Sequence, residues 1–199
     1  MLLGVQTPGR IKGSAIRGFL LWYERAHAER LAQAVAAIPP ALGRELDLER
    51  PALGILPSTW YPMELAHAVL DELVRDLSPS ELDSLGTAGG EATVASMMHG
   101  VYRFLFTQVL SPARYGHVVG LLWKFSYDTG KVTNRELGPN RHQGIVSGWA
   151  GHHPLLCRMN IAAKRAMYVQ MGGKNVIVET RSCITDGATS CGSIIRWDR

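Results

Sequence analysis

The stretch WKFSYDTGKVTNRELGPNRHQGIVSGW, residues 123–149, decides the fold class, because the pattern of apolar residues changes here. Before it, apolar residues recur at helical spacing; within it, Trp123, Phe125 and Tyr127 alternate with polar residues. A period of two residues is typical of a strand with one buried face. We therefore expect helices up to residue 122 and a sheet from residue 123 onward.

Turn sequences divide this C-terminal part into strands. Asp128-Thr129-Gly130 predicts a hairpin between a strand at 123–128 and a return strand at 132–137, which 143–149 continues after a second turn. Further on, Pro154 opens and Gly172-Gly173 closes a predicted helix, and the last two strands are expected at 175–184 and 191–197. The connections are short enough for antiparallel pairing, so we expect an antiparallel four-stranded sheet in ββαββ order.

The N-terminal part is predicted to be helical. Apolar residues at helical spacing favour helices over 14–38, 59–77, 91–110 and 112–122. Ser78 and Glu81 match a capping box and start a short helix, which the glycines of residues 86–90 are expected to end. The fold class is therefore α+β, with helices packed on the sheet, in a single domain over 1–199 whose helical part is 1–122 and whose ββαββ part is 123–199.

Composition narrows the classes of function. The chain of 199 residues is 46% hydrophobic and carries a net charge of +4, with no block of like charges, so a nucleic-acid partner is not favoured. No HExxH, GxSxG, GxGxxG or GxxxxGK[ST] motif is present. The N-terminus has no secretory pattern and no apolar run reaches membrane-spanning length, which predicts a cytoplasmic protein without a membrane span.

The three cysteines are the most informative constellation. Cys183 and Cys191 flank a predicted hairpin turn, and Cys157 lies in the first turn of the preceding helix. Three thiolates at one point would suit zinc, for which His153, one helical turn before Cys157, is the better-placed fourth ligand. Glu179 is about 13 Å along a strand from Cys183 and is poorly placed. The alternative is that the cysteines are small buried hydrophobes.

Aromatic residues form a second candidate site. If a cavity exists between helices and sheet, Trp60, Tyr102, Trp123, Phe125 and Tyr127 are the residues expected to line it. Such a cavity, apolar with a few polar tips, is typical of small-molecule sites. The alternative is that these side chains simply fill the core.

Stretches that carry a family resemblance extend over nearly the whole chain: Arg10–Ala15, Pro57–Pro62, Gly100–Arg103, Tyr127–Gly130, His153–Cys157, Cys183–Gly187, Cys191 and Trp197. Together they resemble a myxobacterial family of proteins of about this length. The C-terminal half, from Trp123, is in turn similar to the 4-vinyl-reductase-like sensor domain. That domain is related to the aromatic-sensing domains of some transcription activators and to subunits of the TRAPP tethering complex. The resemblance implies a dimeric fold with an internal ligand cavity.

The resemblance also implies a metal site. In the aromatic-sensing members zinc is held by three cysteines and a glutamate, and Cys157, Cys183 and Cys191 match the cysteine positions. The glutamate position is occupied here by Thr180, with Glu179 one place away. TRAPP subunits can carry a fatty acyl chain, so the resemblance implies an acyl ligand as a further possibility.

These observations favour a non-catalytic sensory module, a homodimer that binds a small apolar or aromatic ligand and signals through a protein partner. The alternative is a dimeric scaffold protein without a ligand. A cysteine-dependent enzyme is the third hypothesis, because a thiol and a histidine base can meet in space without a sequence motif.

Overall fold

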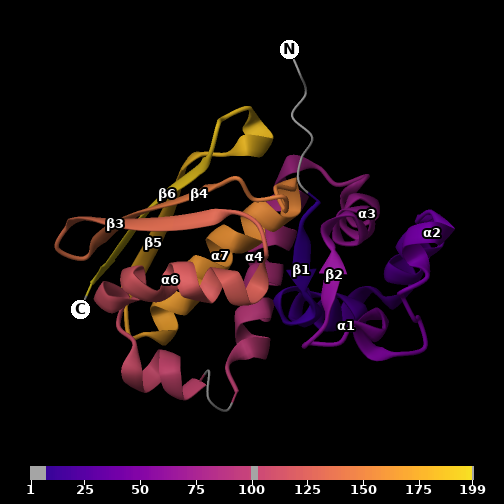
Figure 1. Cartoon of the computed structure of the whole chain (residues 1–199), viewed down its shortest axis with the longest axis horizontal. Helices are drawn as coiled ribbons and strands as arrows, with labels where there is room; N and C mark the ends of the chain where they lie inside the picture. The colour runs from indigo at the N-terminus through magenta and orange to yellow at the C-terminus, as the bar shows by residue number, and fades with distance from the viewer. Residues whose placement is uncertain (1–7, 100–102, 199) are drawn as a thin grey trace.

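The N-terminal elements pair a small sheet with helices. The computed structural model describes residues 8–99 and 103–198 (Figure 1). Strand β1 (Arg10–Lys12) pairs antiparallel with β2 (Trp60–Pro62), and each strand leads directly into a helix, α1 (Gly13–Ala37) or α3 (Met63–Val74). The short helices α2 (Pro40–Gly43) and η1 (Pro51–Gly54) connect them. The apolar spacing predicted both long helices, whereas the two three-residue strands were missed.

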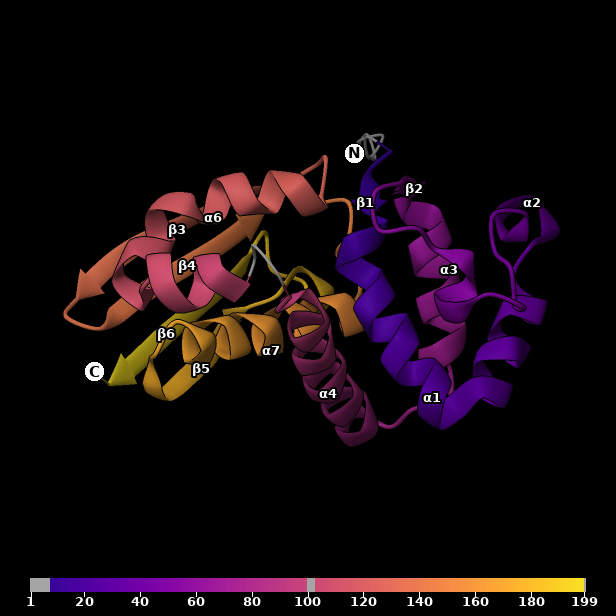
Figure 2. The ribbon, with the colours of Figure 1, turned by 90° about the horizontal axis from the view of Figure 1, so that it is seen from below.

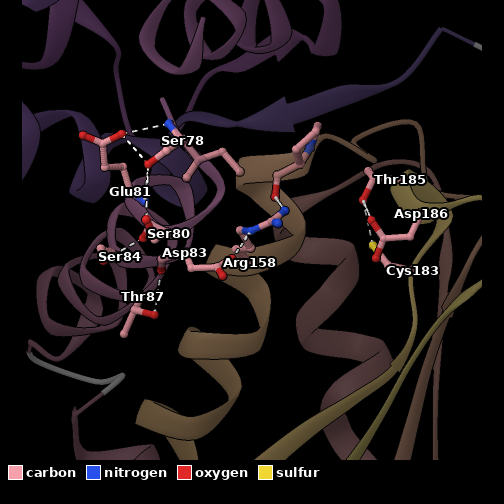
Figure 3. Close-up of polar contacts among 12 residues, drawn as sticks. Ser78, Ser80, Glu81, Asp83, Ser84, Thr87, Arg158, Cys183, Thr185 and Asp186 are labelled. Carbon is pink, nitrogen blue, oxygen red and sulfur yellow. Dashed lines mark hydrogen bonds and ion pairs between the residues drawn. The ribbon is translucent and has the colours of Figure 1, made fainter. Parts of the chain in front are cut away.

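Helix α4 (Pro79–Met97) runs without a break through the glycines expected to end it. The predicted capping box is confirmed, because the Ser78 hydroxyl accepts a hydrogen bond from the Glu81 amide while the Glu81 carboxylate accepts one from the Ser78 amide (Figure 3). The glycines allow close contact instead. A Cβ atom on Gly90 would lie 2.4 Å from the carbonyl oxygen of Met159, and one on Gly89 would lie 2.7 Å from Phe19.

Helix α6 (Pro112–Ser126), which follows the short helix η2 (Leu105–Val109), occupies most of the stretch predicted as the first strand. The strand at 123–128 is therefore wrong. Trp123 and Tyr127 are four residues apart, so they share one face of the helix end and are 8% and 9% exposed, whereas Phe125 points away and is 54% exposed. Residues 123 and 127 fit both patterns, because residues four apart lie on the same face of a strand and on the same face of a helix.

The predicted ββαββ order is confirmed. Strands β3 (Lys131–Gly138), β4 (Arg141–Ser147), β5 (Lys174–Ser182) and β6 (Cys191–Asp198) form one antiparallel sheet in the order β3-β4-β6-β5. Helix α7 (Pro154–Gln170) connects its two hairpins, and the short helix η3 (Ile184–Asp186) follows β5.

Helices α6 and α7 both pack against the sheet, and α4 lies between α7 and α1 (Figure 2). A core cluster of aromatic and aliphatic side chains joins the C-terminal end of α7 to η2, α6, β5 and β6. Its members are Phe106, Tyr115, Tyr168, Met171, Val176, Ile195 and Trp197. In residues 8–99 and 103–198, no helix combines the length and the apolar character that a membrane crossing requires.

Candidate functional site: an apolar cavity with a partly buried lysine

A cavity of about 170 Å³ lies where the N-terminal helices meet the sheet domain. Its walls come from α1, α4, α6 and α7, the helices that Figure 2 shows around the centre of the molecule. Most of the lining is apolar, including Val94, Met97, Val119 and Leu122. The apolar lining suits a small apolar molecule, and the volume is close to that of an engineered apolar cavity of about 150 Å³ that holds benzene.

A larger groove of about 380 Å³ lies on the outer side of α7, between α4 and the turn after β5. Ion pairs cross it, with Arg158 Nε 2.5 Å from Asp83 Oδ1 and Arg165 Nη1 3.3 Å from Glu91 Oε1 (Figure 3 shows the first). Its charges neutralise one another on an exposed surface. The apolar cavity is therefore the better candidate for a ligand site.

Aromatic rings close one end of the cavity. Trp123 and Tyr127, which line it, pack edge-to-face against Trp149 with ring centroids 5.1 and 4.8 Å away. The Trp123 indole donates to the Thr129 carbonyl oxygen at 3.0 Å. Phe125 contributes to the lining from the exposed side. Three of the five aromatic residues expected at a ligand site thus meet at one cavity.

Of the other two residues, only Trp60 can be placed. Trp60 belongs to β2, where Arg10 and Lys12 lie over its ring at 5.7 and 5.3 Å, away from the cavity. Tyr102 falls outside the described residues.

A lysine supplies the strongest polar group of the cavity. Lys164, in the middle of α7, reaches the inner face of the sheet, where its Nζ donates to Ser193 Oγ at 3.2 Å. Ser193 is fully buried and pairs across the sheet with Gly144, whose missing side chain leaves space beside the ammonium group. Burial lowers the pKa of Lys164 to about 8, against an opposing effect of Cys191 and Cys157. The sequence did not distinguish this lysine from surface lysines.

The phenols around the cavity remain neutral. Burial raises the pKa of Tyr127 to about 12, and it also raises the pKa of Tyr115. The Tyr115 hydroxyl contacts the Met167 sulfur at 3.5 Å. Neither phenol can therefore serve as an anionic group at neutral pH.

The three cysteines come together at the end of the same helix. Cys191 Sγ lies 3.5 Å from Cys183 Sγ and 3.9 Å from Cys157 Sγ, and all three are free thiols. The fourth member is His152, with its Nδ1 3.4 Å from Cys191 Sγ and 3.8 Å from Cys157 Sγ. The spacing argument thus found the three sulfur atoms but chose the neighbouring histidine.

His153 is turned away because both of its ring nitrogens are engaged. Nδ1 accepts a hydrogen bond from the Leu155 amide and caps α7, while Nε2 lies 3.2 Å from Asp71 Oδ1 on α3. Its place at the N-cap fixes the ring against the helix end, so only the preceding residue can face the sulfur atoms. Glu179 pairs with Arg181 and Arg196 on the sheet surface.

The thiols differ in acidity. Burial raises the pKa of Cys157, with the neighbouring thiols adding to the rise, and it also raises the pKa of Cys191. Burial acts the same way on Cys183, but hydrogen bonds from Thr185 and from the other thiols outweigh it and hold that pKa below its usual range (Figure 3 shows the Thr185 contact). Buried thiols with raised pKa values are weak nucleophiles at neutral pH.

Comparison with known proteins shows which solved structures share this fold. No protein-family model and no curated protein matches the chain. Among solved structures, an H-NOX protein from S. oneidensis in the Fe(II) state matches with a TM-score of 0.68 at 10% identity, over 95% of this chain and 97% of that one. An Fe(II) unliganded H-NOX protein from K. algicida matches with a TM-score of 0.63 at 16% identity, over 95% and 97%. At these identities the likeness shows a shared fold.

These findings correct two predictions. The resemblance to the 4-vinyl-reductase-like sensor domain is wrong, because the structures that share the fold are H-NOX proteins. The zinc cofactor is corrected as well: the metal named for those structures is ferrous iron, and other structures of the fold are described by their heme. Proteins hold haem iron through histidine, cysteinate, methionine or tyrosine.

The cavity of this chain does not fit a haem. None of the histidines or cysteines in the described ranges lines it, and His117 on α6 is exposed to solvent. Tyr115 and Met167 contact each other, and the tyrosines are held neutral by burial. The volume of about 170 Å³ is also below the roughly 300–1,000 Å³ of ordinary ligand pockets. The chain thus shares the fold of the H-NOX structures, whereas the residues described around this cavity do not form a haem site.

Proposed function

We propose that this chain is a non-catalytic sensory module, which binds a small apolar or aromatic molecule in the cavity between α4, α6 and α7 and signals through a protein partner. The observation that carries the proposal is the cavity itself, an apolar space with three aromatic residues at one end. The fold likeness to H-NOX proteins supports a ligand-binding role.

The position of the cavity suits a sensor because it touches the connection between the two parts of the molecule. Tyr127 lines the cavity and also forms a β-bridge with Ile11 of β1. The next residue, Asp128, accepts hydrogen bonds from the amide and the Nε of Arg10 at 2.6 and 2.7 Å. A ligand that shifts the end of α6 would therefore move β1 and the helix that follows it.

Catalysis by a cysteine is not supported by the geometry. His152 is the base nearest to the sulfur atoms, and burial lowers its pKa, while burial raises the pKa of Cys157 and Cys191. A thiol enzyme needs the opposite arrangement, in which a cationic neighbour lowers the thiol pKa. Cys183 has a lowered pKa, but its Sγ contacts Thr185 and Cys191 rather than His152, so the geometry favours a structural role for the cluster.

The proposal is tested by thermal unfolding of the purified protein with a panel of small aromatic and aliphatic compounds. We expect some of them to raise the melting temperature in a concentration-dependent way. Leu122→Trp fills the cavity and should abolish the effect, whereas Leu121→Trp, on the exposed side of the same helix turn, should leave it unchanged. No stabilisation by any compound would favour the scaffold alternative.

Haem is the ligand that this proposal has to exclude by experiment, because it is named for structures that share the fold. Mixing the protein with haem and recording the visible absorption spectrum tests it. We expect the spectrum of unbound haem. A stoichiometric complex with an axial ligand from the protein, lost in His117→Ala, would replace the small apolar ligand by haem.

Dimerisation stays a prediction, and light scattering coupled to size-exclusion chromatography measures it directly.

A further inference from the structure

Lys164 is a cation in an apolar place without an anionic partner. Within residues 8–99 and 103–198, no carboxylate forms an ion pair with it, and its Nζ donates only to the Ser193 hydroxyl. The two arginines that flank it on α7, Arg158 and Arg165, are paired with acids of α4. The unpaired cation of this helix is therefore the one that is partly buried against the sheet, where an uncompensated charge costs more than on the surface.

The Lys164 side chain lines space that a ligand could occupy. The side chain lines both the apolar cavity and a smaller pocket beside the cysteines, and Asn160, one turn earlier on α7, lines the same two spaces. The titratable groups that act on it are Cys157 of α7 and Cys191 of β6, and both thiols are neutral at neutral pH because burial raises their pKa. No group of this chain thus supplies the missing negative charge.

We propose that Lys164 binds the carboxylate of the ligand, so that the cavity takes a small aromatic carboxylate, with its ring between Met97, Val119 and Leu122. This inference rests on the proposed function and specifies its ligand class. Asn160 lines the same cavity and donates from its amide to the Leu156 carbonyl oxygen at 3.0 Å, and Ser193 accepts from Lys164, so Lys164 is the group that would hold the carboxylate. The volume of about 170 Å³ suits one ring with a small substituent, since an engineered apolar cavity of about 150 Å³ holds benzene.

Isothermal titration with benzoate and with benzamide, which has the same shape without the charge, tests the inference on the wild-type protein. We expect benzoate to bind about 10- to 100-fold more tightly than benzamide, because a hydrogen bond to a charged group is stronger than one between neutral groups. In Lys164→Met the preference should disappear through loss of benzoate affinity. Lys174→Met, which removes an exposed lysine at the start of β5, is the matched control and should keep it.

The outcomes separate this inference from the proposed function. Equal binding of the two compounds by the wild type, or an unchanged preference in Lys164→Met, would overturn the role of Lys164 and leave the cavity as a ligand site. Stabilisation by neutral aromatic compounds without any binding of benzoate would do the same. If no compound of either kind binds, the proposed function itself fails. The wild-type comparison needs no variant, so it holds even where a substitution disturbs folding.

Discussion

The two sides of helix α7 differ in how tightly they are packed. Toward α4 the backbones approach so closely that Gly90 has no room for a Cβ atom beside Met159. Toward α6 the helices stand apart, and the space between them is the cavity around Lys164. A dry interior is normally packed to the density of an organic crystal, so the space left open on one side of a tightly held helix is the feature on which the proposed ligand site rests.

The largest expected effect comes from breaking the tight side. Gly90→Val places a side chain 2.4 Å from the Met159 carbonyl oxygen and 2.7 Å from Ala162 Cβ, with rigid backbone on both sides. We expect the free energy of unfolding to fall by about 3 kcal/mol, measured by urea denaturation. Gly43→Ala, where nothing lies within 4 Å of the added atom, is the control and should change it little. A cost near zero would mean that α4 and α7 are not in close contact.

On the open side, removing the buried charge should stabilise the protein. Lys164→Met keeps the length of the side chain and replaces an unpaired ammonium group by an apolar end, which we expect to raise the free energy of unfolding by about 1–3 kcal/mol without ligand. Urea denaturation at pH 7 measures it, with Lys174→Met as the unchanged control. A loss of stability would show that Ser193 compensates the charge fully.

The pH dependence sharpens the same point. The pKa of Lys164 is lowered to about 8 in the folded protein, against about 10.4 for an unfolded lysine. Between these values the unfolded state binds more protons, so the destabilising contribution of Lys164 is fully present below pH 8 and is relieved as the pH rises toward 10. The stability gain of Lys164→Met over the wild type should therefore shrink across this window.

Taking the difference between the two proteins removes the contributions of other groups. Burial raises the pKa of Tyr115, Tyr127 and Tyr168, and such groups destabilise the folded state as the pH rises above about 10. They are common to both proteins. A difference that is constant from pH 7 to pH 10 would contradict the lowered pKa.

The sequence predicted the features that depend on neighbouring residues in the chain. It missed the features that depend on contacts between distant residues. The ββαββ order followed from Gly and Pro turns and short strands, which act within a few residues. The α4 glycines allow close contact with Met159 and Phe19, which are far away in the chain. Without those contacts in view, the glycines were interpreted as a helix end. Trp123 and Tyr127 fit both a strand and a helix, and only the packing of Trp149 and Thr129 against them decides for the helix.

The candidate sites divide in the same way. The three cysteines could be brought together from their spacing, because a hairpin and a helix start are local structures. The choice between His152 and His153 depends on the Asp71 contact and the helix cap, which spacing does not contain. Lys164 could not be identified, since a lysine on an amphipathic helix is usually solvated and only the sheet beneath it shows that this one is enclosed.

The smallest expected effect tests whether a larger side chain fits on the α6 side of α7, although none fits on the α4 side. Val119→Leu adds one methylene group to a wall of the cavity, where open space can receive it, and leucine has the higher helix propensity. We expect a gain of up to about 0.5 kcal/mol in urea denaturation. Because the added group takes up ligand space, benzoate and benzamide should both bind more weakly while their ratio is kept. A destabilisation comparable to that of Gly90→Val would mean that both sides of α7 are equally filled, and the cavity would then no longer be a candidate site.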